Sequence, residues 1–295
     1  MLALGLRLLA AMILSAMLML VKLAGERGLW LPETMFWRQL IPAIGIFGWL
    51  AARGELHRLR TDRPWIHARR AFLGTTGMFF TLGVVLLLPL AEATVLGFAA
   101  PIFAVILSAT VLREHVGIWR WTAVVLGLVG VVLTTGFDRS HLPLAGVAVG
   151  IMSALMVALV SIQVRDLART EEPLRVVFYF SAFSLPALAP FLLFTDLHHD
   201  ATSWAIIAGI GLTGLVAQIL MTAALRLGSV SSVIVMDYSS LGWAAMWGFL
   251  VFGQLPPAST WVGAPVVMVA GLIIAWREQV VARKRGPRGP QHLPA

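Results

Sequence analysis

Long apolar segments alternate with short polar ones along almost the whole chain. A helix needs about 20 mostly apolar residues to cross the ~30 Å hydrocarbon core of a bilayer. The pattern therefore predicts an all-α membrane protein with ten transmembrane helices. We place these helices at residues 5–24, 32–52, 70–88, 93–112, 117–136, 144–164, 174–195, 203–225, 230–252 and 258–276.

The composition supports a membrane protein and excludes several other classes. The 295 residues are 59% hydrophobic and 12% charged, whereas a soluble domain carries about 25% charged residues. No cysteine is present, which excludes disulfides, thiolate metal sites and a cysteine nucleophile. The N-terminal segment "MLALGLRLLAAMILSAMLMLVKLAG" also fits a secretory signal, but its apolar run has the length of a true span. No Walker A or hydrolase motif occurs, and we expect no cofactor and no enzymatic activity.

The charges predict how the chain is oriented. If both termini lie in the cytoplasm, eighteen of the 22 basic residues fall on the cytoplasmic side, including Arg7. Three fall on the other side, and Arg38 falls inside the second span. Such an asymmetry is typical of the inner membrane of bacteria and requires an even number of spans. The net charge of +8 is thus explained without a nucleic-acid partner.

The chain contains an internal repeat, in which segment 89–114 aligns with segment 229–254 without a gap. Each segment begins at a tight hairpin, crosses as one apolar helix, and is followed by a tryptophan and a glycine-containing helix. Five spans in each half is an odd number, so the second half must be inverted relative to the first. Inverted repeats are common in secondary transporters, which bind substrate near the midplane. We place the repeats at 1–137 and 144–277, with a basic cytoplasmic tail at 278–295.

"PLAEATVLGFAAPIF" followed by "LRE", and "DYSSLGWAAMWGFLVFGQLP" followed by a helix ending in "WRE", resemble the signature regions of EamA-type carriers. These carriers belong to the drug/metabolite transporter superfamily. The resemblance implies a protein of two five-helix repeats that lies in the lipid bilayer and has a small-molecule substrate. It favours export of a small polar or zwitterionic amino-acid-like metabolite, including a metallophore-type compound. The alternative is uptake of a metabolite such as S-adenosylmethionine or riboflavin. A membrane-embedded enzyme or a channel is a remote alternative. Gln254 stands where many family members carry Glu.

Asp237 is the main candidate for a binding residue. A carboxylate within a span is costly, so it should face the bundle interior or a wet cavity. It either binds an amine-bearing substrate, takes up a coupling proton, or stabilises helix packing through Tyr238, a serine or a neighbouring helix.

Arg38 is the second candidate. It either contacts a substrate carboxylate or phosphate, reaches the membrane surface, or forms a structural ion pair for which Asp237 is one candidate partner.

Further candidates surround these two charges. Ser240 and Trp243 follow Asp237 at helical spacing and share a face with it. Gln218 is the bulkiest uncharged polar residue well inside a span. We expect the substrate site to include Asp237, Tyr238, Arg38, Trp37, Trp243, Gln218 and Ser240; the alternative for each is helix packing.

Other features point to structure more than to binding. Pro101 should kink the fourth span. Gly146, Gly150, Ala154 and Ala158 form a stripe of small residues that predicts close helix packing. Glu92 and Glu114 lie at turns, where helix capping is expected. His198 and His199 lie in a polar loop, and a solvated loop is favoured there over a surface metal site.

Overall fold

The structure is a computed structural model that describes residues 2–110, 116–135, 143–167, 170–227 and 236–284. The described residues form a bundle of helices, and nine segments are long and apolar enough to cross a membrane. The first part of the predicted ninth span lies outside the described residues. The prediction of an all-α membrane protein is confirmed.

The helices follow the predicted spans, with shifted ends. In chain order they are α1 (Leu2–Glu26), α2 (Leu31–Ala52), η1 (Leu56–Leu59), α3 (Pro64–Leu87), α4 (Leu90–Gly97), α5 (Ala100–Thr110), α6 (Ile118–Thr135), α7 (Leu144–Leu167), α8 (Pro173–Leu188), η2 (Ala189–Phe194), α9 (Ala201–Leu227), η3 (Met236–Tyr238), α11 (Ser239–Phe252) and α12 (Ala258–Lys284). Hydropathy marks the apolar core of a span and not its caps, so α3 begins six residues before the predicted span, at a proline in its first turn.

α12 differs most from the prediction. It continues to Lys284, seven residues into the segment that we assigned to the basic tail. The sequence there is rich in residues of high helix propensity, which extend a helix beyond the apolar span. Glu114 and residues 285–295 lie outside the described residues.

The fourth span is broken near its middle. α4 ends at Gly97, and α5 begins at Ala100. Pro101 has no N–H to donate to the carbonyl of Gly97 four residues earlier, and its ring would clash with that carbonyl in a continuous helix. The predicted kink is therefore present, and it lies on the N-terminal side of the proline.

Helices of one repeat pack against helices of the other. α1 packs along α9, and α3 packs along α7. When the internal alignment is extended along the chain, α1 corresponds to α7 and α3 to α9, so the two contacts are equivalent. α2 with α8, and α6 with α12, are also contacts between equivalent helices, and α4 of the fourth span contacts α11 of the ninth. This pattern is that of two inverted five-helix repeats around a pseudo-two-fold axis, as predicted.

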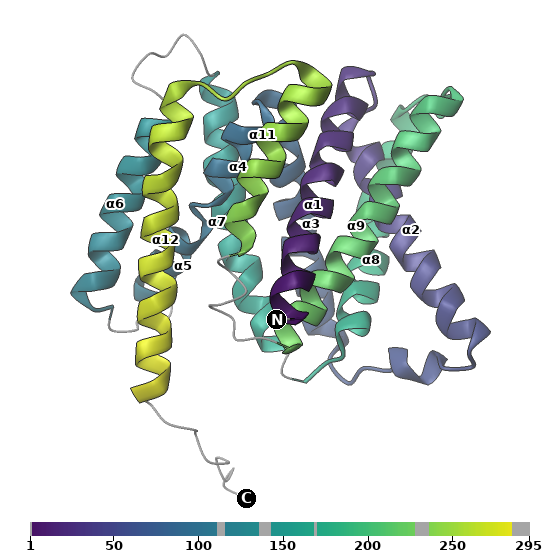
Figure 1. Cartoon of the computed structure of the whole chain (residues 1–295). Helices are drawn as coiled ribbons and strands as arrows, with labels where there is room; N and C mark the ends of the chain where they lie inside the picture. The colour runs from purple at the N-terminus through teal and green to yellow at the C-terminus, as the bar shows by residue number, and fades with distance from the viewer. Residues whose placement is uncertain (1, 111–115, 136–142, 168–169, 228–235, 285–295) are drawn as a thin grey trace, which may run out of the picture.

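Small residues allow the closest helix contacts. A Cβ atom at Gly146 or Gly150 of α7 would lie 2.5 Å from a side-chain atom of Leu88 or Leu96, as the predicted stripe requires. α6 and α12, which lie side by side at one edge of the bundle (Figure 1), cross at Gly130 and Gly263.

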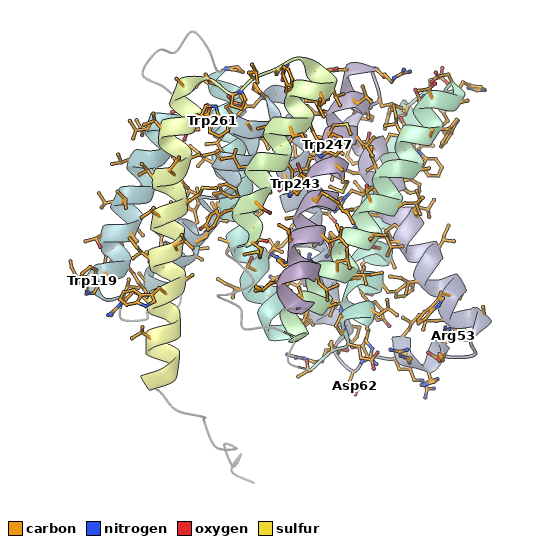
Figure 2. The ribbon with its side chains drawn as sticks, in the orientation of Figure 1. Arg53, Asp62, Trp119, Trp243, Trp247 and Trp261 are labelled. Carbon is orange, nitrogen blue, oxygen red and sulfur yellow. The ribbon has the colours of Figure 1, made fainter. Side chains whose placement is uncertain are left out.

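Both ends of the described chain lie at one end of the bundle. The start of α1, the η1 segment and the end of α12 share this end, which we call the N-terminal end (Figure 1). The other is the opposite end. Trp119 and Trp261 lie at the bundle periphery towards different ends (Figure 2) and are both more than half exposed, as expected of tryptophans at membrane interfaces.

Candidate functional site

Asp237 lies in η3, at the start of the described part of the ninth span, and is bound by Arg7. The Arg7 guanidinium, on α1, donates from Nε to Oδ1 at 2.5 Å and from Nη2 to Oδ2 at 2.6 Å. The Arg7 side chain is 10% exposed and that of Asp237 34%. Two parallel charge-assisted bonds form the strongest common ion-pair geometry. Arg7, and not Arg38, is thus the partner of Asp237.

The role of Arg7 differs from the prediction. The charge pattern assigns Arg7 to the cytoplasmic side, although the residue falls within the first predicted span. An ionisable residue inside a span is itself a signal for a functional or paired group, and that signal was available. What the sequence could not supply was the pairing, because the partners are separated by 230 positions.

The fourth and ninth spans meet at equivalent positions of the two repeats. The internal alignment places Phe98 on Tyr238, and their rings contact edge to face with centroids 5.0 Å apart. Beside this contact, the hydroxyls of Ser239 and Ser240 donate to the carbonyls of Met236 and Asp237 at 2.6 Å. Both bonds run from a side chain to the carbonyl three residues earlier. The Ser240 hydroxyl therefore donates within the turn that carries Asp237.

The aromatic candidates of this segment carry unused hydrogen-bond donors. The buried indole nitrogens of Trp243 and Trp247 on α11, and the hydroxyl of Tyr238, have no hydrogen-bond partner among the described residues. Trp243 and Trp247 lie one helical turn apart on α11, which packs beside α1 (Figure 2). A buried donor without an acceptor is costly, and a polar ligand would supply the acceptor.

Arg38 lies among neutral groups. On α2 it is half-buried, with Nη1 at 3.1 Å from the Gln39 side-chain oxygen and at 2.6 Å from the Met78 sulfur. Its Nε lies 3.3 Å from the sulfur of Met17 on α1. No described carboxylate forms an ion pair with it, so its charge is not neutralised there. Gln218 shares a face of α9 with Gly214, where an added Cβ atom would lie 3.6 Å from Arg38 Nε. Gln218 is therefore one helical turn from the position beside Arg38.

Arg38 and Asp237 are not adjacent. Arg38 contacts α1 at Met17, and Asp237 contacts α1 at Arg7. Ten residues of α-helix separate these points, which is about 15 Å. A free α-amino acid is too short to bridge the two charges in this conformation.

Trp37 belongs to a third group, at the opposite end. Its indole nitrogen donates to Oε1 of Glu33 at 3.3 Å, and His199 Nε2 lies 2.7 Å from the same oxygen. The Trp37 ring also contacts Trp204, with centroids 5.2 Å apart. Glu33 is fully buried. Its position at the first turn of a predicted span gives no sign of this role in the sequence.

Two clefts open at the opposite end. One, of about 530 Å³, is bounded by Trp30, Glu33 and His199 with Phe194, Asp196 and His198. The other, of about 370 Å³, is lined by Lys22, Glu26 and Trp30 with neighbouring residues of the α1–α2 turn. Glu92 lies deeper and accepts a bond from Thr260 at 3.1 Å. The described residues contain no group of three or more potential metal ligands.

The loops at the N-terminal end are tied together. Glu171 accepts bonds from Arg175 at 2.6 Å and from Thr61 at 2.7 Å. Burial opposes ionisation of Glu171, but these hydrogen bonds outweigh it and lower the pKa of the carboxyl below its usual value. Arg58 bonds both Glu55 and Glu172, which joins the α2–α3 connection to the start of α8.

The sequence matches the EamA-like transporter family over residues 1–136 and 144–276. A pseudopaline exporter, CntI, of Pseudomonas aeruginosa strain UCBPP-PA14 is 30% identical over 193 residues, 64% of this chain and 66% of that protein. The chain thus spans just under two thirds of that relative.

Other relatives match over a greater length. A riboflavin transporter of Vibrio cholerae is 28% identical over 83% of each chain. An S-adenosylmethionine uptake transporter of Rickettsia bellii is 26% identical over 86% of each chain. One solved crystal structure of a protein shares the fold with a TM-score of 0.62 at 17% identity, over 95% of this chain and 98% of that one.

Proposed function

The chain belongs to the EamA-like transporter family, and from that membership we propose that it is an inner-membrane secondary transporter that exports a small amino-acid-like metabolite. The family makes it a multi-pass membrane transporter with a small-molecule substrate, and not an enzyme. We propose four further properties: the outward direction of transport, the amino-acid-like substrate class, the location in the inner membrane, and the cytoplasmic location of both termini.

The Arg7–Asp237 ion pair is the observation that carries the mechanism. It holds α1 against η3 near the N-terminal end, whereas the clefts open at the opposite end. In alternating access, one end closes when the other opens around a site between the repeats. We assign the ion pair as the contact that closes the N-terminal end, and the charge asymmetry of the sequence makes that end cytoplasmic.

The same pair offers a means of coupling. The Asp237 side chain is about one third exposed, so a proton or a substrate amine can reach it. Either would replace the Arg7 guanidinium as the partner of the carboxylate and release α1 from η3. A coupling proton would then drive export by being bound at Asp237 and released on the other side.

The substrate class rests on the polar groups inside the bundle. They combine the carboxylate of Asp237, the cation of Arg38, and the unused donors of Tyr238, Trp243 and Trp247. Such groups suit an amino-acid derivative better than an apolar compound. The relative in Pseudomonas aeruginosa, an exporter of pseudopaline, supports the outward direction.

Metabolite profiling tests the proposal. Cells lacking the gene should retain at least one amino-acid-like metabolite that wild-type cells release, and a gene copy should restore release. A copy with Asp237→Asn should not restore it, whereas Asp62→Asn, at an exposed position of the α2–α3 connection, should do so. Release unchanged by loss of the gene would contradict export.

Uptake is the second candidate, because the riboflavin and S-adenosylmethionine transporters match over a larger share of the chain. It predicts the opposite result: cells with the gene accumulate labelled riboflavin or S-adenosylmethionine faster than cells without it. Export predicts no difference in that assay.

A further inference from the structure

Two arginines, Arg70 and Arg38, lie near the middle of the bundle and form no ion pair with a described carboxylate. Arg70 on α3 is 5% exposed. Its Nε and Nη1 have no hydrogen-bond partner among the described residues, and its guanidinium lies over the ring of Phe180 at 4.3 Å. The half-buried Arg38 bonds, among the described residues, to two methionine sulfurs and the Gln39 amide. Sulfur atoms and an aromatic ring are weak partners for a cation.

The two guanidinium groups lie against the same face of α3. Nη1 of Arg70 occupies the place that a Cβ atom of Gly74 would take, and Nη1 of Arg38 contacts Met78. Gly74 and Met78 are four residues apart, so these points are about 6 Å apart along the helix. The two like charges act on each other. Both points lie near the middle of α3, at the depth expected for a transporter's substrate.

Polar groups of neighbouring helices border this pair. The Gln39 amide donates to the Ser184 hydroxyl at 3.3 Å, and the Thr75 hydroxyl donates to the same oxygen at 2.6 Å. These groups are neutral, so they leave both charges uncompensated. The nearest acidic residue along α2, Glu33, is already bound by His199 and Trp37.

We propose that Arg38 and Arg70 form an anion site for a small organic molecule with two carboxylates. Guanidinium groups bind carboxylates through two parallel bonds. Two cations one helical turn apart match two carboxylates at a similar separation. The absence of a Cβ atom at Gly74 leaves room for the Arg70 guanidinium. This inference rests on the proposed function and narrows its substrate to an acidic amino-acid derivative.

Binding by the purified full-length protein tests the site. The probes are glutarate, its monoamide glutaramate, and inorganic phosphate, compared by thermal shift at constant ionic strength. Glutarate should raise the melting temperature at concentrations at least tenfold below those that glutaramate requires. Arg38→Gln and Arg70→Gln should each weaken the glutarate response at least tenfold. Arg69→Gln removes the same charge from the adjacent, exposed position and should leave the response unchanged.

The stability of the unliganded variants separates binding from structure. Removing an uncompensated buried charge should leave the melting temperature of Arg70→Gln unchanged or higher, because sites built for ligands reduce stability. Arg70→Lys keeps the charge but loses the two parallel bonds, so its glutarate response should be weaker than that of the wild type and stronger than that of Arg70→Gln. This comparison tests the site even if Arg70→Gln folds poorly.

Several results would overturn the site. They are a glutarate response that survives Arg70→Gln, a response lost equally in Arg70→Lys, and a response to phosphate without one to glutarate. The proposed function has an independent test. If loss of the gene leaves metabolite release unchanged but glutarate binding depends on Arg70, export is refuted and the anion site stands. If release depends on the gene but glutarate does not bind, the anion site is refuted and export stands.

Discussion

At the scale of residues, the charged side chains inside the bundle differ in whether they have a partner of opposite charge. Arg7 and Asp237 neutralise each other, whereas Arg38 and Arg70 have no described counter-ion. A paired charge in an apolar environment stabilises contacts between its two elements, but an unpaired one is costly. We therefore assign the pair to conformational control and the unpaired arginines to ligand binding.

Removing both members of the pair should destabilise the protein less than the two single losses added together. Arg7→Gln and Asp237→Asn should each cost about 1–3 kcal/mol, less than for a fully buried pair because Asp237 is about one third exposed. The double variant should lose less than the sum, by about 0.5–3 kcal/mol. Thermal or denaturant melts in detergent measure this, and additive losses would show that the two side chains do not interact.

The loop network predicts a pH dependence. Because the pKa of Glu171 is lowered in the folded protein, its contribution is full above its unfolded value of about 4.3 and is lost as pH falls through the folded pKa. The melting temperature of the wild type should exceed that of Glu171→Gln by a constant amount from pH 7 to about pH 5. Below about pH 4 the difference should shrink. A constant difference down to about pH 3 would contradict this assignment.

At the scale of elements, the fourth span is interrupted, and the described part of the ninth span begins at the equivalent position. Pro101 explains the interruption of the fourth span, and the sequence predicts it. The described part of the ninth span begins with η3, where Asp237 bonds to Arg7. The sequence predicts Asp237 on a regular α-helix, whereas the structure places it in this 3₁₀ turn.

The crossing of α6 and α12 depends on glycine. A Cβ atom at Gly263 would lie 2.4 Å from the backbone nitrogen of Thr134 and 2.7 Å from the carbonyl oxygen of Gly130. Since backbone atoms cannot move aside cheaply, Gly263→Ala should cost about 1–3 kcal/mol. Gly242→Ala, on α11 with nothing within 4 Å, should be neutral or gain up to ~1 kcal/mol. Equal melting temperatures for the two variants would refute this packing.

The sequence predicted elements well and contacts poorly. Hydropathy located the spans, because each span is a local apolar run, and charge parity with the internal alignment predicted the inverted repeats. The site depended on contacts between distant residues. Arg7 and Asp237 are separated by 230 positions, and Arg70 was counted as a loop charge because α3 begins earlier than its apolar core. Local patterns carry no information on such pairs.

At the scale of the whole molecule, the helix pairs suggest which bodies move. α1 with α9, and α3 with α7, are equivalent under the pseudo-two-fold axis, and each pair combines helices from both repeats. Rocking of one pair against the other exchanges the open end of the bundle without breaking either pair. Arg7 and Asp237 would resist that motion at the N-terminal end.

Spin-label distances test this claim most directly, because the chain has no cysteine to remove. One pair of labels, at Leu9 on α1 and Trp65 on α3, reports on the N-terminal end, and another, at Thr202 on α9 and Leu144 on α7, on the opposite end; all four positions are exposed. In Asp237→Asn, we predict a longer first distance and a shorter second one, with Asp62→Asn like the wild type. Distances that stay unchanged, or that change in the same direction at both ends, would contradict alternating access controlled by the Arg7–Asp237 pair.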